Sequence, residues 1–290
     1  MPWRQVCARL ALLAQDGTSW WSQVARDPQT VLAWNDHTLV VRWAGNAALW
    51  VDALPQGLLV RTAEEYLCLS PPGFRVVLEP AAANFPGIIR QVDDVARRFV
   101  AFRRRVMRVA HPQAGLVDFL ALREPCVGAV DILLAEGAPR VDLVLVHPQG
   151  VLSCWLVRRA ESLRSASARH ALVRQAAALR RELAQPQSMA TLEGLLGRWS
   201  HVPALFASKR PRRLVQAVCS EPAVLITGFL PELRPAVTAW AEDLRSQGVT
   251  RVVSVADPAH FSPRHWSMAE IDGRGGGAWE LRSDAANTCS

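Results

Sequence analysis

The sequence predicts an α/β protein in which a small, mainly antiparallel β domain precedes an α/β sandwich with a mixed sheet. Two observations carry this prediction. Short β-forming runs separated by turn residues fill the stretch between residues 30 and 80. Farther along, three strand-like runs are followed by two helical segments, a strand, a helix and a last strand. A chain of 290 residues can hold one large domain or two small ones.

The N-terminal region is predicted to be helical before it becomes a β meander. Apolar side chains recur on one side of a helix over residues 2–15, namely Val6, Leu10 and Leu13. A second short helix around Trp20 and Trp21 follows a break at Asp16-Gly17. Turn residues then separate five predicted strands, at 37–43, 47–53, 57–63, 65–70 and 74–80. This order predicts a small antiparallel meander.

A long helix is predicted over residues 86–110, with its apolar side chains on one face. Five arginines lie mostly on the opposite face: Arg97, Arg98, Arg104, Arg105 and Arg108. They fit either a solvated helix face or a surface that contacts phosphates. A second basic segment contains Lys209, Arg210, Arg212 and Arg213, and there we favour a clamp on a nucleic-acid backbone over a solvated turn.

The remaining elements are predicted from periodicity and turn residues. Helices are expected at 116–122, 165–184, 189–199 and 231–247, and strands at 129–134, 141–146, 151–157, 223–228 and 249–255. The helix at 165–184 has a predicted buried stripe of Leu172, Ala176, Leu179 and Leu183. A flexible tail is expected from Gly273. We expect domain boundaries at 1–85, 86–112 (a basic connecting helix), 113–270 and 271–290.

The composition of the chain limits its expected binding partners and its expected cellular compartment. The formal net charge of +7 permits nucleic acid or another acidic partner. The six cysteines are far apart and form no C-x-x-C pair, which argues against a structural zinc site and favours a reducing, cytoplasmic setting. The sequence shows neither a signal peptide nor an apolar run long enough to span a bilayer, so no membrane partner is expected.

The most informative stretch is residues 139–163. Two apolar, strand-like runs are joined by a turn at residues 147–150, Asp142 begins the first run, and Arg158-Arg159 ends the second. This hairpin resembles that of the restriction-endonuclease-like superfamily, the PD-(D/E)xK nucleases. The resemblance extends over residues 116–255, roughly half of the chain, through the order of helices and strands.

The resemblance implies a divalent-metal site with part of its chemistry missing. In such a site an aspartate and an acid on the next strand bind the metal, and a lysine two residues after the acid acts on the attacking water. By resemblance Asp142 is the metal aspartate, Leu156 occupies the acid position and Arg158 the lysine position. Leucine cannot bind a cation and arginine stays protonated, so hydrolysis is not expected.

Other carboxylates are candidates to complete the site. Glu161 follows the second strand, while Asp131 and Glu124 precede the first; with any of them Asp142 would hold Mg²⁺ or Mn²⁺. Without them no cofactor is expected. Some family members carry a glutamine and a tyrosine on the following helix. Here those positions hold Gln175, which we interpret as a surface residue, and Leu179.

The favoured hypothesis is a nucleic-acid-binding protein, with DNA as the favoured ligand, built on a catalytically degenerate nuclease fold. Arg158 and Arg159 would contact phosphates, and the two basic segments would extend the binding surface. DNA repair, mobile-element and defence roles are typical of such folds. One alternative is an active metal-dependent DNA nuclease with a migrated acid. Another is a non-enzymatic assembly subunit that binds a protein partner through its N-terminal domain, for which an exposed apolar patch on residues 30–80 would be expected.

Overall fold

The computed structural model describes residues 2–35, 37–55, 57–62, 66, 99–109, 112–147, 150–201 and 217–263. The chain is a mixed α/β protein that divides into two compact units. The first comprises residues 1–132 and 192–212, and the second comprises residues 133–191 and 213–290. This division differs from the predicted domain boundaries, because residues 113–132 group with the N-terminal sheet.

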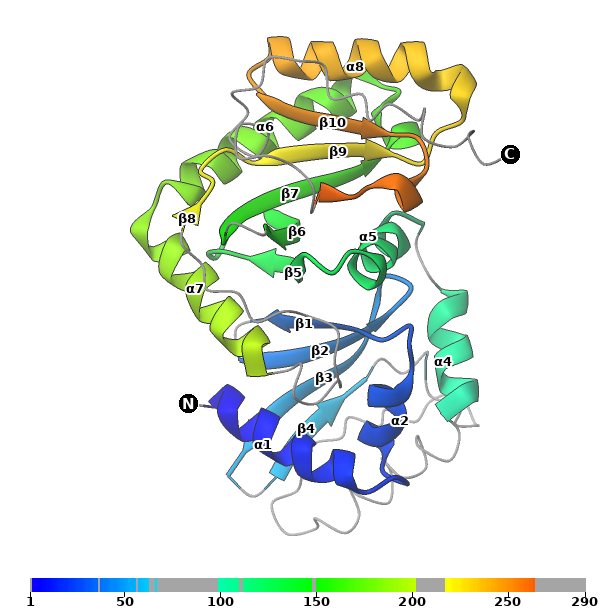
Figure 1. Ribbon diagram of the computed structural model, residues 1–290, viewed down its shortest axis with the longest axis vertical. Helices are drawn as coiled ribbons and strands as arrows, with labels where there is room; N and C mark the ends of the chain where they lie inside the picture. The colour runs from blue at the N-terminus through cyan, green and yellow to red at the C-terminus, as the bar shows by residue number, and fades with distance from the viewer. Residues whose placement is uncertain are drawn as a thin grey trace, which may run out of the picture. The chain divides into compact units, whose positions relative to one another are not determined.

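The first unit contains a four-stranded antiparallel sheet in the order β1-β2-β3-β4 (Figure 1). Its strands are β1 (Val31–Asn35), β2 (Thr38–Trp43), β3 (Asn46–Leu54) and β4 (Gly57–Arg61). The predicted meander is confirmed for these strands. β1 was not among the predicted runs, because its side chains are buried almost throughout and so show no alternation. The strands predicted at 65–70 and 74–80 lie outside the described residues, apart from Tyr66.

Two N-terminal helices cover this sheet. The helix α1 (Pro2–Gln15) packs against β3 and against α2 (Trp20–Arg26), as Figure 1 shows. Val6 and Leu10 of α1 are buried as predicted, whereas Leu13 is only half-buried. The Ser19 hydroxyl accepts a hydrogen bond from the Ser22 amide and so caps the first turn of α2.

The basic helix is described as α4 (Phe99–Arg108) and packs on β2 and β3. The predicted helix is thus confirmed over these residues, while its first part, residues 86–98, lies outside the described chain. Phe99 and Phe102 meet Trp43 edge to face, with ring centroids 5.7 and 6.1 Å apart. The helix α5 (Pro112–Arg123) packs on β1 and β2 and leads into β5 (Val127–Leu133).

The second unit contains a mixed sheet in the order β10-β9-β7-β6. Its strands are β6 (Arg140–Val146), β7 (Val151–Arg159), β9 (Ala223–Thr227) and β10 (Arg251–Val255), with the short β8 (Ala217–Val218) beside β7. The β6–β7 pair is antiparallel, whereas β7, β9 and β10 are parallel. β9 is buried along its whole length, as expected for a strand inside a covered sheet.

Helices border this sheet. They are α6 (Ala166–Leu183), the start of α7 (Pro186–His201) and α8 (Arg234–Ser246), with short 3-10 turns η2 (Ala160–Leu163), η3 (Pro231–Leu233) and η4 (Pro258–His260). The predicted stripe of α6 is confirmed, since Leu172, Ala176, Leu179 and Leu183 are all buried. α8 packs on β10 and ends before Gly248, whose φ of 95° is accessible at little cost only to glycine.

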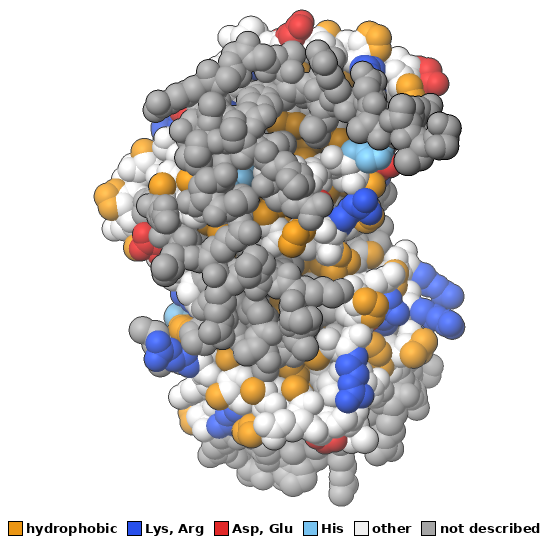
Figure 2. Space-filling model, viewed as in Figure 1, with side chains coloured by type: hydrophobic (Ala, Val, Ile, Leu, Met, Phe, Trp, Pro, Cys, Tyr) orange, Lys and Arg blue, Asp and Glu red, His pale blue; other side chains and the backbone are white. Residues whose placement is uncertain are grey.

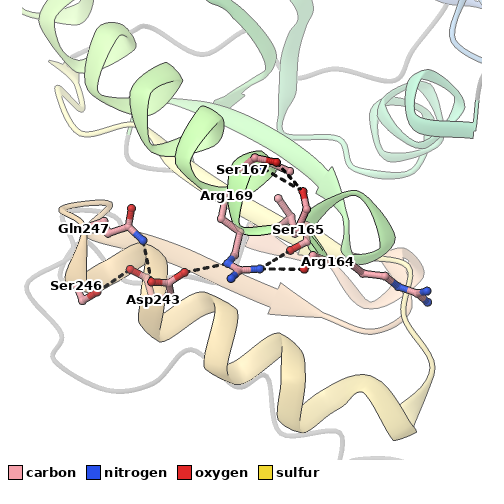
Figure 3. Close-up of polar contacts among 9 residues, drawn as sticks. Arg164, Ser165, Ser167, Arg169, Asp243, Ser246 and Gln247 are labelled. Carbon is pink, nitrogen blue, oxygen red and sulfur yellow. Dashed lines mark hydrogen bonds and ion pairs between the residues drawn. The ribbon is translucent and has the colours of Figure 1, made fainter.

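A polar network joins α6 to α8 (Figure 3). Arg169 donates its Nε hydrogen to Asp243 at 2.9 Å and its Nη1 hydrogens to the carbonyls of Leu163 and Arg164. Gln247 also donates to Asp243, at 2.7 Å. These hydrogen bonds hold the pKa of Asp243 below its ordinary value. The network therefore sets the start of α6 against α8.

None of the helices in the described part of the chain combines the length and apolarity that a bilayer-spanning segment needs. The cysteines that the structure describes, Cys7, Cys126, Cys154 and Cys219, form no disulfide bond with one another.

Candidate functional site

The predicted hairpin is formed by β6 and β7. Leu143 pairs with Trp155, so the antiparallel register, continued by one residue, sets Asp142 opposite Leu156. Residues opposite one another in an antiparallel pair share a face, and Arg158 lies two residues farther on that same face. The turn closes through a hydrogen bond from the His147 amide to the Val151 carbonyl at 2.9 Å. The hairpin therefore brings Asp142, Leu156 and Arg158 to one end of one face.

The carboxylate of Asp142 accepts hydrogen bonds from two donors. Its Oδ2 atom accepts a hydrogen bond from the Val157 amide and another from Arg158 Nη1, each at 2.7 Å. The side chains of Asp142 and Arg158 are 23% and 20% exposed, so water reaches this ion pair only in part. Charge-assisted hydrogen bonds of this kind are stronger than neutral ones.

Arg158 also reaches the helix that covers this face. Its Nη2 atom donates to Gln175 Oε1 on α6 at 2.5 Å, and Nη1 donates to the Val157 carbonyl at 2.5 Å. The interpretation of Gln175 as a surface residue is therefore wrong, because its side chain is half-buried and holds the guanidinium. We call Asp142, Arg158 and Gln175 the hairpin cluster.

The donor set of the hairpin cluster does not fit a divalent cation. Such an ion requires several oxygen ligands, but the only carboxylate here already holds a guanidinium. Leu156, at the acid position, is fully buried and has no oxygen to offer. Among the described residues no group of three or more His, Cys, Asp or Glu side chains could hold a metal ion. The cluster can position a charge and a hydrogen-bond network, but it has no free base.

The other residues predicted near this hairpin are placed as follows. Arg159 ends β7, pairs in register with Thr227 of β9 and is 35% exposed. Glu161, in η2, lies 3.9 Å from Arg159 Nη2 and is 62% exposed. We therefore interpret Glu161 as an ion-pair partner of Arg159.

Asp131 and Glu124 belong to the first unit, where Asp131, whose side chain is 32% exposed, contacts a buried arginine in a cluster that the sequence did not predict. Arg42 of β2 donates to Asp118 of α5 at 3.1 Å and to Asp131 of β5 at 2.5 Å. Asp118 also accepts the Gly45 amide at 2.5 Å. We call Arg42, Asp118 and Asp131 the Arg42 cluster. Glu124 is buried at the end of α5, and its carbonyl accepts the Val127 amide.

The Arg42 cluster supports a strained turn. Ala44 and Gly45 have φ values of 49° and 89°, the pattern of a two-residue hairpin turn between β2 and β3. Alanine adopts this conformation only at a cost, which the hydrogen bonds from Gly45 to Asp118 and from Arg42 to the Gly45 carbonyl offset. α5 approaches closely at Gly115, where a Cβ would lie 3.2 Å from the Ala44 carbonyl oxygen. Burial raises the pKa of Asp118, while Arg42 and the Gly45 amide oppose this shift.

The second unit has a buried polar group of its own beside the hairpin turn. His147 Nε2 lies 2.7 Å from the Ser153 hydroxyl, which also accepts Trp155 Nε1 at 2.7 Å. Arg251 of β10 lies over the Trp155 ring, 5.7 Å from its centroid. Burial and the positive charge of Arg251 lower the pKa of His147 to about 4, so this histidine is neutral at pH 7. We interpret it as a core residue.

The predicted basic surface is described only in part. Arg104, Arg105 and Arg108 of α4 are exposed. On the face drawn in Figure 2, basic side chains gather where Figure 1 draws α4, with hydrophobic ones beside them. Arg97, Arg98 and the segment with Lys209, Arg210, Arg212 and Arg213 lie outside the described residues.

A scan of protein-family models finds no match to this chain, and searches among curated proteins and solved structures likewise return no significant match.

Proposed function

We propose that the protein binds nucleic acid, with DNA favoured, through a restriction-endonuclease-like unit that does not hydrolyse it at the β6–β7 hairpin. The observation that carries this proposal is the guanidinium of Arg158, bound to Asp142 where a nuclease of this type would hold its metal. This ion pair can form within a restriction-endonuclease-like fold, but it takes the place of a metal ion held by two carboxylates.

The order of elements supports the nuclease-like fold. β6 and β7 form the hairpin, and α6 follows and contributes Gln175 beside it. The parallel strands β9 and β10, connected by α8, then extend the sheet from β7. This order agrees with the resemblance noted in the sequence.

Charge supports nucleic acid as the ligand. The net charge of +7 attracts polyanions, and the arginines exposed on α4 offer phosphate contacts from the first unit. Asp142 neutralises the charge of Arg158. At the hairpin we therefore expect the neighbouring Arg159 to contact the phosphate. Roles in DNA repair, mobile-element activity or defence follow from fold analogy.

An assay of cleavage and binding on the same DNA tests this proposal. Plasmid and single-stranded DNA are incubated with the protein in Mg²⁺ or Mn²⁺, with Asp142→Ala as a control. We expect no cleavage by either protein. In the absence of metal we expect gel-shift binding that weakens steeply as salt rises.

Two results would contradict the proposal in different ways. Cleavage that Asp142→Ala abolishes would favour the active nuclease with a migrated acid. Absence of binding at low salt would favour the assembly subunit. The exposed apolar patch expected for that subunit is not seen on the described residues 31–35, 37–55 and 57–62, where every large hydrophobic side chain is buried or half-buried.

A further inference from the structure

The outer face of α4 carries basic and hydrophobic side chains together. Val100 and Met107 are 61% and 37% exposed, and Arg104 and Arg108 are exposed between and beside them. Positions four, seven and eight residues after Val100 lie on the same side of a helix, so these side chains form one surface. Because it spans two turns of α4, the surface is about 10 Å long.

This surface is held firmly from below. Phe99 and Phe102 pack against Trp43, and Asn46 donates to the Val106 carbonyl at 2.8 Å. On the flank, Arg103 lies 2.7 Å from Asp27. Arg104 and Arg108 differ from Arg103, because within the described chain no carboxylate pairs with them. A ligand would therefore meet a pre-ordered backbone and two guanidinium groups that keep their charge.

Helix stability explains only half of this surface. Arginines in the last turn interact favourably with the helix dipole, which accounts for Arg108. The dipole does not account for Val100 and Met107, which expose apolar surface to water. Their position beside Arg104 and Arg108 points to a ligand with negative charge and apolar faces side by side.

We propose that the outer face of α4 binds single-stranded nucleic acid in preference to duplex. This inference rests on the proposed nucleic-acid binding and names the form of the ligand. A duplex shows its phosphates outward and keeps its base faces stacked inside, so Val100 and Met107 would gain little from it. A single strand offers unstacked base faces beside its phosphates, which apolar side chains and guanidinium planes can both contact.

An acidic amphipathic helix of a partner protein has similar chemistry. Arginine rather than lysine supplies the charge here, and a planar guanidinium stacks on bases in addition to pairing with phosphates. The net charge of +7 also suits a polyanion. We therefore commit to the nucleic acid, and the peptide becomes one outcome of the test.

The test measures fluorescence anisotropy with two labelled probes, an oligothymidylate and a duplex of equal total charge. The apolar variant is Val100→Ser with Met107→Gln, and the charge variant is Arg104→Gln with Arg108→Gln. A matched control, Arg174→Gln with Arg181→Gln, removes two exposed arginines from α6. Thermal melting by circular dichroism checks that all variants are folded.

We expect the unaltered protein to bind the oligothymidylate about tenfold more tightly than the duplex. The apolar variant should lose most of this preference while keeping its duplex affinity. The charge variant should lose affinity for both probes, and more than the α6 control does, because it removes phosphate contacts.

Each contrary result has its own meaning. Equal binding of both probes, with no effect of the apolar variant, would overturn the single-strand inference and leave nucleic-acid binding intact. Absence of binding to either probe at low salt would overturn the proposed function and this inference with it. Binding of an acidic amphipathic peptide, lost in both α4 variants while nucleic-acid binding is unchanged in them, would assign the face to a protein partner instead.

Discussion

The Arg42 cluster and the hairpin cluster join the same chemical groups in different surroundings. In the first, the side chains of Arg42 and Asp118 are 7% and 2% exposed. In the second, those of Arg158 and Asp142 are 20% and 23% exposed. Each arginine also has a second, partly exposed polar partner: Asp131, whose side chain is 32% exposed, for Arg42, and the half-buried Gln175 for Arg158.

The difference in burial gives the two clusters different tolerance to the loss of a charged partner. A charge pair without access to water must remain complete, because removing one partner leaves the other charged group desolvated. The buried Arg42–Asp118 pair therefore holds α5 to the strained turn at residues 44–45, and its guanidinium is not available to a ligand. In the hairpin cluster, water can replace a lost partner, so we expect a substitution there to cost less stability. A substitution in this cluster can also change the charge that a ligand contacts. Three predictions test this difference, and another concerns the buried histidine of the second unit.

The largest effect is expected from Arg42→Met. The substitution removes both ion pairs and leaves Asp118 buried without a guanidinium, which costs about 3–5 kcal/mol of unfolding free energy. Urea unfolding followed by tryptophan fluorescence measures the loss. Adding Asp118→Leu to this variant should recover part of it, because the buried charge is then gone. A loss under about 1 kcal/mol would show that the cluster does not hold the turn.

The second prediction concerns the buried polar group of the second unit. His147 has a pKa of about 4 in the folded protein, and an unfolded histidine titrates near 6.5. The unfolded state alone gains this proton between these values, so stability falls as pH decreases from about 6.5 to 4. At roughly 1.4 kcal/mol for each pH unit, the loss reaches at most about 3 kcal/mol.

Urea unfolding as a function of pH, compared between the unaltered protein and His147→Gln, isolates this contribution. The glutamine cannot take up a proton, so the difference in unfolding free energy between the two proteins should shrink as pH decreases. A difference that is constant with pH would mean that His147 is not buried as a neutral group.

The third prediction breaks the hairpin cluster in the same way as the first breaks the Arg42 cluster. Arg158→Met leaves Asp142 with the Val157 amide and with access to water. We expect a loss of about 1–2 kcal/mol, smaller than for Arg42→Met. The same urea titration measures both, and Gln175→Ala, which removes only one hydrogen bond, should cost less than Arg158→Met. Equal losses in Arg42→Met and Arg158→Met would remove the distinction between the two clusters.

Most of the helices and strands could be predicted from the sequence, but the contacts between distant residues could not. The buried stripe of α6 was predictable, because burial of one helix face leaves a local period in the sequence. The strands β6, β7 and β9 were predictable as short apolar runs bounded by turn residues. The meeting of Arg42 and Asp118 was not, because 76 positions separate them and no local pattern links the two residues. Gln175 was misjudged for the same reason, since its spacing along α6 says nothing of a guanidinium on β7. The positive φ of Ala44 also leaves no sequence signal, because alanine is not a residue that such turns favour.

The smallest expected effect is a gain of nucleic-acid affinity in Asp142→Asn. Asparagine can still accept the Val157 amide, but it no longer neutralises Arg158, so the end of the hairpin gains one positive charge. One added charge at a partly exposed site should strengthen binding about twofold to fivefold at low salt and less at high salt. Fluorescence anisotropy with a labelled oligonucleotide measures the change.

The matched control is Asp118→Asn, which removes the same charge from the Arg42 cluster. There the guanidinium stays buried and cannot reach a phosphate, so the affinity of the folded protein should not rise even though the net charge is the same. A gain of equal size in both variants would mean that overall charge alone sets the affinity. A gain confined to Asp142→Asn would show that the ligand approaches Arg158, and that Asp142 restrains binding at the position where a nuclease would use its aspartate to hold a metal.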